Sequence, residues 1–344
     1  MKILVYGIGA MGSIYASLLS RSSNEVFAVD PWKEHISEIK KNGLKIEGAS
    51  GNNTYKNINA LFSIPKKIKF DLIIIATKAS GVKIAAQDIK EFTNNKTIII
   101  SIQNGIGSTD DLKLYIPKNN IIIGVADGFG ASIVKPGHIH HNAMKLIRLG
   151  ELDNKVTERL NLICDLWSKA GFNVLAYDNI NQLIWEKFIC NVTFSAPCTV
   201  YECSVGEIIN NNDFWKVASG CALEAFEIAT KKNIPLSFDA PTEYVRNFGL
   251  KMPKAKPSMY LDHLSKRKSE IDFINGRVEI MGEELNIKTP YNFILSSIVR
   301  QKELVFKFVF LHKNDLVCAH PSQELESFSS KYLLYLQHPQ YQVF

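Results

Sequence analysis

The chain has 344 residues, 46% of them hydrophobic and 22% charged, a composition that excludes a disordered or fibrous protein. Its length exceeds the size at which one hydrophobic core stays compact, which predicts two domains. The formal net charge of +6 comes from lysines spread along the chain, without the dense basic run that is typical of a nucleic-acid-binding protein.

Cysteines and histidines show no pattern typical of a metal site. The six cysteines contain no CxxC pair and no zinc-ligand spacing, so we expect reduced thiols. His138, His140 and His141 follow a Pro-Gly turn without a nearby carboxylate, and we interpret them as structural residues at a sheet edge. No stretch reaches the ~20 apolar residues of a membrane span. We therefore expect a cytoplasmic protein with no metal, no membrane association and no nucleic-acid partner.

Short β-branched runs alternate with amphipathic segments in the first half of the chain, as in a parallel sheet with crossover helices. The expected strands of this sheet are residues 3–6, 26–29, 72–76, 97–102 and 121–125. Beyond Gly130, closely spaced runs predict antiparallel strands added at an edge of the sheet, at 131–135, 138–141 and 145–149. We expect a helix over 155–170 and a last strand over 173–176 to follow.

Helical periodicity replaces the β-branched runs from about Asp178 onward, in segments broken by prolines. This change predicts an all-helical second domain. We expect a first domain over 1–177, a helical domain over 178–304 and a C-terminal extension over 305–344, to which the sequence assigns no role.

A glycine-rich turn joins the first expected strand to a helix. The first glycine of such a turn permits the tight bend, the second lets a pyrophosphate approach the backbone, and the third lets the helix pack on the strand. The helix N-terminus offers free N–H groups and a positive dipole end to the phosphates. The alternative is a purely structural turn. We predict a Rossmann dinucleotide-binding domain whose cofactor turn consists of Gly7, Ile8, Gly9, Ala10, Met11 and Gly12.

The second expected strand ends in Asp30, eighteen residues after Gly12. A carboxylate at this place accepts hydrogen bonds from the adenosine ribose hydroxyls and repels a 2′-phosphate, which favours NADH over NADPH. Lys33 and the pair Lys40-Lys41 are close in sequence and could offset that repulsion. Both cofactors therefore remain open.

The segment WEKFICNVTFS, residues 185–195, is the most informative part of the helical half. If it is helical, Lys187, Asn191 and Ser195 form one polar stripe among apolar side chains. Partial desolvation lowers the pKa of a lysine from ~10.4 toward the range of a proton donor. The alternative is a surface lysine whose stem covers apolar residues.

An ordered set of motifs resembles the ketopantoate reductase (2-dehydropantoate 2-reductase) family over about residues 1–300. The motifs are the glycine-rich turn, Thr77-Lys78, QNGIG at 103–107, WEKFICN at 185–191, Ser258-Met259 and EIDFING at 270–276. The resemblance implies an α/β fold, with a Rossmann domain followed by an all-helical domain of the 6-phosphogluconate dehydrogenase type. It implies an active site in the cleft between the domains, and a homodimer is a family-level expectation.

The resemblance also implies two catalytic residues. Lys187 matches the lysine that protonates the oxyanion formed as hydride reaches the keto carbon. Glu270 matches a glutamate that holds the distal hydroxyl of the substrate and supports the lysine electrostatically. We expect Glu270 to share a helical face with Ile274 and Met281, and the alternative is an exposed glutamate in a charged run.

Further family positions imply substrate and cofactor contacts. Asn104 matches an asparagine near both nicotinamide and substrate. Asn191 matches a ligand of the substrate hydroxyl, and Ser258 matches a ligand of its carboxylate, although a serine after a proline is also a typical helix N-cap. Lys78 matches a lysine at the cofactor cleft. Ser195, which we also expect to contact substrate, stands where the family commonly has a second asparagine.

Two other positions depart from the family pattern. Asp30 replaces the basic residue that usually contacts the 2′-phosphate of NADPH, so family usage favours NADPH whereas Asp30 favours NADH. The segment after about Val305 extends beyond the usual family length. We predict reduction of ketopantoate to pantoate in the route to pantothenate and coenzyme A. The alternatives are reduction of a different 2-oxo acid and a non-catalytic dinucleotide-binding protein.

Overall fold

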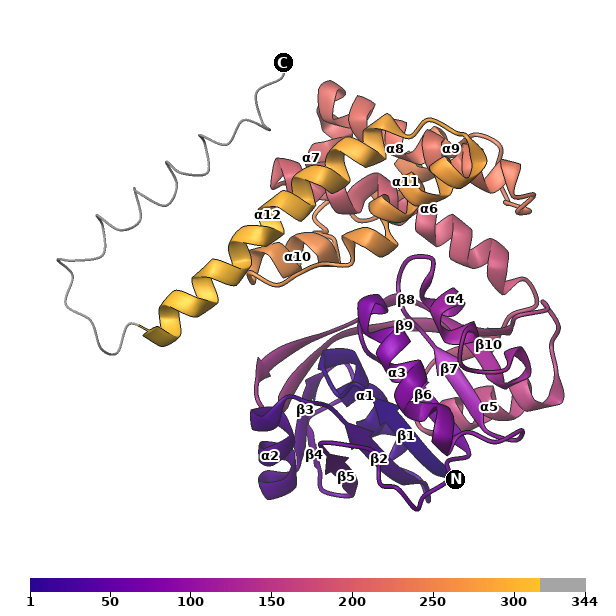
Figure 1. Ribbon diagram of the computed structural model, residues 1–344, viewed down its shortest axis with the longest axis vertical. Helices are drawn as coiled ribbons and strands as arrows, with labels where there is room; N and C mark the ends of the chain where they lie inside the picture. The colour runs from indigo at the N-terminus through magenta and orange to yellow at the C-terminus, as the bar shows by residue number, and fades with distance from the viewer. Residues whose placement is uncertain (316–344) are drawn as a thin grey trace, which may run out of the picture.

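The computed structural model describes residues 1–315, in which an N-terminal sheet domain is followed by a C-terminal helical domain (Figure 1). The predicted α/β class with a helical second half is therefore confirmed. Helix α6, Ile180–Tyr201, leads from the sheet domain into the helical domain, and its first residue packs in the core of the sheet domain. The junction between the domains thus lies along α6.

Six strands form the parallel part of the sheet, in the order β5-β2-β1-β6-β7-β8. Their bounds are β1 Lys2–Tyr6, β2 Glu25–Val29, β5 Ile58–Leu61, β6 Leu72–Ile75, β7 Ile98–Ser101 and β8 Ile121–Lys135. All four residues of β6 are buried, since this central strand is covered on both faces. This strand order is that of a dinucleotide-binding domain, with the first strand at the centre.

The prediction of short antiparallel strands at a sheet edge is wrong in its detail. The run 131–135 continues β8, and the next two runs are parts of one long strand, β9, His138–Glu151, which is antiparallel to β8. On its other side β9 pairs with β3, Leu44–Gly48, and β10, Val174–Ala176, and β4, Asn53–Tyr55, pairs with β3. Glycines and two register shifts interrupt the apolar pattern of the β8–β9 hairpin, which made long strands look like short ones.

Helices cover both faces of the sheet. The core of one face includes α1, Ala10–Leu19, α2, Lys33–Asn42, and α5, Glu158–Lys169. The other face packs against α3, Val82–Ile89, and α4, Ser108–Lys113. Every residue of α1 from Gly12 to Leu19 is buried, because the helix contacts β8, β9 and β3 as well as β1 and β2. The helix into which the glycine-rich turn leads is thereby held from several sides.

From α6 to residue 315 the regular elements are all helical, and they share one apolar core. They are α7 Val205–Asn210, α8 Asn212–Lys231, α9 Pro241–Leu250, α10 Ser258–Leu264, α11 Asn275–Leu285 and α12 Pro290–Asp315. Helix α12 runs across the 304/305 boundary that the sequence predicts, and residues 316–344 of the expected extension lie outside the described residues. Within residues 1–315, no helix is long and apolar enough to cross a bilayer.

Candidate active site

The three glycines of the N-terminal turn differ in the space around them. A Cβ atom on Gly7, whose φ is +93°, would lie 2.8 Å from the backbone nitrogen of Thr77, and one on Gly12 would lie 1.9 Å from the carbonyl oxygen of Gly7. A Cβ on Gly9 would meet no atom within 4 Å. The outer glycines therefore let the turn pack, whereas Gly9 leaves open space before the N-terminus of α1. This space fits a pyrophosphate group.

Asp30 lies at the end of β2 and is tied to the same turn. Its carboxylate accepts hydrogen bonds from the backbone N–H groups of Ile8 and Trp32, each at 2.9 Å. It borders a cavity of about 630 Å³ that extends from Gly7 along the ends of the strands. The charged residues around this cavity are Asp30, Lys66, Asp88 and Glu91. Their acidic excess favours hydroxyl groups over an additional phosphate.

The lysines near this cavity are not those that the sequence suggested, Lys33 and the pair Lys40-Lys41, with the exception of Lys40. Lys66 lines the cavity and was missed, since it lies in the loop between β5 and β6, far in sequence from Asp30. Lys40 lies over the ring of Phe62, another lining residue, at 4.8 Å from the ring centroid. Lys33 is not among the residues that line the cavity.

Lys187 lies on α6 where this helix faces the sheet domain. Its Nζ donates a hydrogen bond of 2.7 Å to the carbonyl oxygen of Ala126 in β8. Burial lowers the pKa of Lys187, and the negative charges of Asp127 and Glu270 oppose that shift. The side chain is thus an inward-facing cation at the domain junction, which excludes the alternative of a surface lysine.

Glu270 lies directly before the short 3-10 helix Ile271–Phe273 and α11, and not on one continuous helical face with Ile274 and Met281 as expected. The 3-10 turn, in which Ile274 has φ −116° and ψ −102°, interrupts that periodicity. The carboxylate accepts a hydrogen bond of 2.8 Å from the backbone N–H of Ala79, in the sheet domain. The alternative of an exposed glutamate is therefore excluded.

The pKa of Glu270 is raised by burial. The hydrogen bond from Ala79 and the positive charges of Lys78 and Lys187 oppose the shift, while the negative charge of Asp262 adds to it. The charges of Lys187 and Glu270 thus interact across the domain junction. This pair is the electrostatic centre of the candidate active site.

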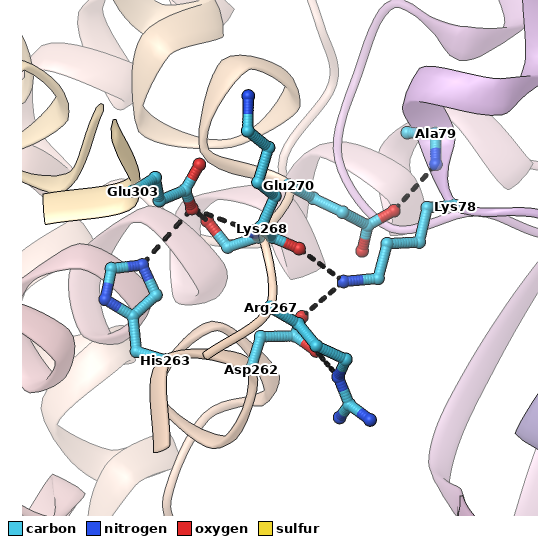
Figure 2. Close-up of polar contacts among 9 residues, drawn as sticks. Lys78, Ala79, Asp262, His263, Arg267, Lys268, Glu270 and Glu303 are labelled. Carbon is cyan, nitrogen blue, oxygen red and sulfur yellow. Dashed lines mark hydrogen bonds and ion pairs between the residues drawn. The ribbon is translucent and has the colours of Figure 1, made fainter. Parts of the chain in front are cut away.

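Lys78 crosses from the sheet domain to the helical domain, as Figure 2 shows. Its Nζ lies 2.7 Å from a carboxylate oxygen of Asp262 and 2.7 Å from the carbonyl oxygen of Lys268. Asp262 also accepts a hydrogen bond of 3.1 Å from Arg267. Asp262 was missed in the sequence, since its place on α10 gives no pattern that distinguishes it from an ordinary surface acid.

Glu303 of α12 holds the segment between Asp262 and Glu270 (Figure 2). Its carboxylate accepts hydrogen bonds from the backbone N–H of Ser269 at 2.7 Å and the hydroxyl of Ser269 at 2.6 Å, and it lies 3.2 Å from His263 Nε2. Burial alone would raise the pKa of Glu303, but the contacts with His263 and Ser269 together lower it. Helix α12 therefore positions the loop that carries Glu270.

Asn104 lies in the loop between β7 and α4, which reaches the helical domain. Next to it, Gly105 has φ +84°, and a Cβ there would lie 2.1 Å from the carbonyl oxygen of Phe273. The backbone N–H of Ile106 donates a 3.0 Å hydrogen bond to the same carbonyl. The loop with Asn104 is thus attached to the segment that follows Glu270, and only glycine fits at residue 105.

Three expected substrate ligands are less closely tied to this centre. Asn191 and Ser195 follow Lys187 on α6, but Asn191 is half-buried and Ser195 is fully buried. Ser258 is the exposed first residue of α10, and Pro257 occupies the N-cap position, so the N-cap interpretation of Ser258 is wrong. Among the described hydrogen bonds, none joins these three side chains to Lys187 or Glu270.

The histidines after the Pro-Gly turn do have a carboxylate partner, which comes from another strand. Glu47 of β3 lies 2.8 Å from His138 Nε2 and 3.5 Å from His140 Nδ1. The sequence could not show this, because β3 pairs with β9 far along the chain. Within residues 1–315, no group of three or more His, Cys, Asp or Glu side chains is arranged to hold a metal ion.

Comparison with known proteins identifies the family to which this chain belongs. Residues 3–154 match the family model "Ketopantoate reductase PanE/ApbA" and residues 179–303 match its C-terminal counterpart. The chain is 31% identical over 308 residues to a 2-dehydropantoate 2-reductase of Streptococcus pyogenes serotype M1, covering 89% of this chain and 99% of that protein. A 2-dehydropantoate 2-reductase of Lactococcus lactis is 30% identical, with the same coverage.

Solved structures show the same fold. D-mandelate dehydrogenase in complex with NADH and anilino(oxo)acetate gives a TM-score of 0.81 at 29% identity, over 89% of this chain and 99% of that chain. A PanE/ApbA family ketopantoate reductase from Ralstonia eutropha gives 0.80 at 24% identity, over 89% and 100% of the two chains. The predicted enzyme class, an oxidoreductase acting on a CH–OH group with NAD(P), is thereby confirmed. With family matches to both of its domains, this chain belongs to the ketopantoate reductase family.

Proposed function

We propose that this protein reduces ketopantoate to pantoate with NADH. One observation carries the proposal: Lys187 is a half-buried cation at the domain junction, hydrogen-bonded to Ala126 and electrostatically coupled to Glu270. A 2-oxo acid needs a proton donor at its keto oxygen when hydride reaches the keto carbon. The names of the relatives from Streptococcus and Lactococcus support ketopantoate as the substrate.

The proton transfer falls to Lys187 in this proposal. When bound, a reduced nicotinamide supplies the hydride. Lys187 gives a proton from Nζ to the keto oxygen, so that C=O becomes CH–OH, and the neutral amine afterwards regains a proton from solvent. The hydrogen bond to Ala126 uses one of the three Nζ donors, which leaves two for the substrate. This hydrogen bond orients the ammonium group before the substrate binds.

Glu270 has two roles in the proposed reaction. Its charge favours the protonated form of Lys187, and its free carboxylate oxygen accepts a hydrogen bond from the distal hydroxyl of the substrate. The hydrogen bond from Ala79 holds the other oxygen. Asn104 and Asn191 are proposed to contact the substrate from the sheet domain and from α6, with Ser195 as a further contact. Ser258 is proposed to bind the substrate carboxylate.

NADH is favoured over NADPH by the surroundings of Asp30. The carboxylate is fixed by two backbone N–H groups at the cavity of about 630 Å³, where it can accept the ribose hydroxyls. Asp88 and Glu91 add negative charge to the same wall, against Lys66 in the lining and Lys40 over the ring of Phe62. A 2′-phosphate would therefore be repelled.

A second candidate is the reduction of a 2-oxo acid with a larger apolar substituent. It is favoured by the likeness to D-mandelate dehydrogenase, whose structure holds NADH. Ser195 is shorter than the asparagine that is common in the family, so a hydrogen bond to the substrate hydroxyl would be lost. A substrate with an apolar substituent does not need that hydrogen bond, which is consistent with this candidate.

Steady-state assays would test both candidates. Purified protein should oxidise NADH, and NADPH more slowly, when ketopantoate is added. Lys187→Ala should lower kcat/KM by about 10²–10⁴ while NADH binding, measured by fluorescence titration, persists. Lys169→Ala, an exposed lysine at the end of α5, is the matched control and should retain full activity.

The outcomes separate the alternatives. Turnover of 2-oxo-2-phenylacetate without turnover of ketopantoate would favour the second candidate. No turnover of any 2-oxo acid with either cofactor would contradict the reductase assignment. Full activity of the Lys187→Ala variant would show that another group donates the proton.

A further inference from the structure

A second cavity lies between the two domains, beside the loop that carries Asn104. Its volume is about 240 Å³, below the ~300–1,000 Å³ of sites for drug-sized ligands. The loop residues Gln103, Gly105, Ile106 and Gly107 form one wall, and Trp185 of α6 contributes to another. Asn104, Lys187 and Glu270 are not among the residues that line it.

The charged residues around this cavity are mostly basic and come from both domains. Lys113 lies on α4 in the sheet domain, whereas Lys232 follows α8 and Arg277 lies on α11 in the helical domain. Asp110 is the single acid in the lining. Three cations facing one carboxylate leave a local excess of two positive charges.

Arg277 is the least compensated of these cations. Its Nε is buried and has no hydrogen-bond partner among the described residues. Its guanidinium lies 3.7 Å from Asp110, which is itself shared with Lys113 at 3.3 Å and is well exposed. Because this Nε has almost no exposed surface, a ligand in the cavity acts on the guanidinium charge, which the shared Asp110 compensates only in part.

We propose that this cavity binds a small phosphate-type dianion. A guanidinium group matches the oxygens of phosphate in a bidentate way, and two lysines supply point charges around it. Ser108 and Thr109 in the same wall offer hydroxyl donors. Because the cations come from both domains, the bound anion holds these domains together, next to the loop with Asn104.

The test uses the full-length protein and inorganic phosphate. Thermal unfolding is measured with increasing phosphate at constant ionic strength, in the presence of saturating NADH, so that the glycine-rich turn is already filled. We expect a saturable rise in Tm that sodium chloride does not reproduce. Succinate, a dicarboxylate of the same charge, should bind more weakly than phosphate.

Two variants and two controls locate the site. Lys232→Met and Arg277→Met should each weaken phosphate binding at least about tenfold, or ~1.4 kcal/mol. Lys231→Met, an exposed lysine at the end of α8 outside the lining, and Lys66→Met, in the cofactor cavity, should bind as the parent protein does. Because Lys232 is exposed, its replacement leaves the fold intact even if that of Arg277 does not.

The proposal is overturned if phosphate raises Tm no more than chloride, or if Lys232→Met binds phosphate as tightly as Lys231→Met does. Loss of binding in Lys66→Met would place the anion in the cofactor cavity instead. Tighter binding of succinate would contradict the preference for phosphate. These readouts measure binding, so they stand or fall independently of whether ketopantoate is the substrate.

Discussion

The surroundings of Lys187 act on its charge in opposite directions. Burial favours the neutral amine, whereas the Ala126 carbonyl and the nearby carboxylates favour the ammonium form. Glu270 is in the mirror situation, because burial favours its neutral form and the Ala79 N–H and two lysines favour the carboxylate. The two side chains therefore depend on each other for their charges, and they titrate as a pair.

The pH dependence of reduction follows from these opposite shifts. The ammonium form of Lys187 is the donor, so kcat/KM should fall as pH rises through a pKa below the ordinary ~10.4. The carboxylate form of Glu270 should be lost as pH falls through a pKa above the ordinary ~4.3. A pH profile of kcat/KM for ketopantoate should thus be bell-shaped and narrower than unshifted groups would give.

Lys187→Arg separates this explanation from a general effect of alkali. A guanidinium group keeps its proton over the whole range, so the variant should be slower and should lack the alkaline limb. An unchanged alkaline limb in Lys187→Arg would assign that limb to another group.

At the scale of elements, the glycines of the N-terminal turn have two different roles. Gly7 and Gly12 allow the turn to pack, whereas Gly9 leaves space for the cofactor. Gly9 has φ −66°, which alanine adopts without strain, and open space beyond its Cα. A Cβ atom on Gly12 would lie 1.9 Å from the carbonyl oxygen of Gly7, which is too close for any side chain. Two substitutions of the same kind therefore have different consequences.

We expect Gly9→Ala to leave Tm nearly unchanged and to weaken NADH binding by about tenfold, or ~1.4 kcal/mol. Gly12→Ala should lower stability by ~1–3 kcal/mol, because the turn must shift to admit the methyl group. Denaturant unfolding and fluorescence titration of NADH distinguish the two effects. A large loss of stability in Gly9→Ala would contradict the assignment of open space to the cofactor.

The sequence could predict those elements whose pattern is local. The buried run 72–76 closely matches β6, and the glycine-rich turn has a local pattern of its own. The residues around Lys187 left a surface lysine open, and only the family resemblance assigned this lysine a role. Strands β3, β4 and β5 were missed, since segments as short as Leu44–Gly48 and Ile58–Leu61 become strands only by pairing with β9 and β2. Asp262 and Glu303 were missed for a similar reason, because their roles arise only when α10 and α12 meet the loop before Glu270.

At the scale of the whole molecule, polar contacts join the domains at their junction. Lys78 contacts Asp262, the Ala79 N–H contacts Glu270, and Lys187 contacts Ala126. Each contact pairs one residue of the sheet domain with one residue of α6 or of the helical domain. Glu303 does not lie at the junction, but it positions the segment between Asp262 and Glu270. A change at Glu303 should therefore affect both the stability of the protein and its activity.

Glu303→Gln should destabilise the protein by ~1–3 kcal/mol at neutral pH, because the Ser269 donors lose a charged acceptor. The lowered pKa of Glu303 means that its stabilisation is fully present above the ordinary value of ~4.3 and is lost as pH falls through the folded-state value. The difference between parent and variant in denaturant unfolding should thus shrink in acid. Glu284→Gln, an exposed change on α11, is the control. Equal stability of Glu303→Gln and parent at neutral pH would show that the contact contributes nothing.

The pairing of β3 with β9 has a consequence for synthesis of the chain. Lys45 pairs with His138, so the edge of β3 stays open until β9 has left the ribosome. Contacts of such large sequence separation form slowly, and an open strand edge is prone to intermolecular pairing. A nascent chain stalled before Glu151 would therefore expose that edge, and translation pauses upstream of β9 should favour aggregation over folding.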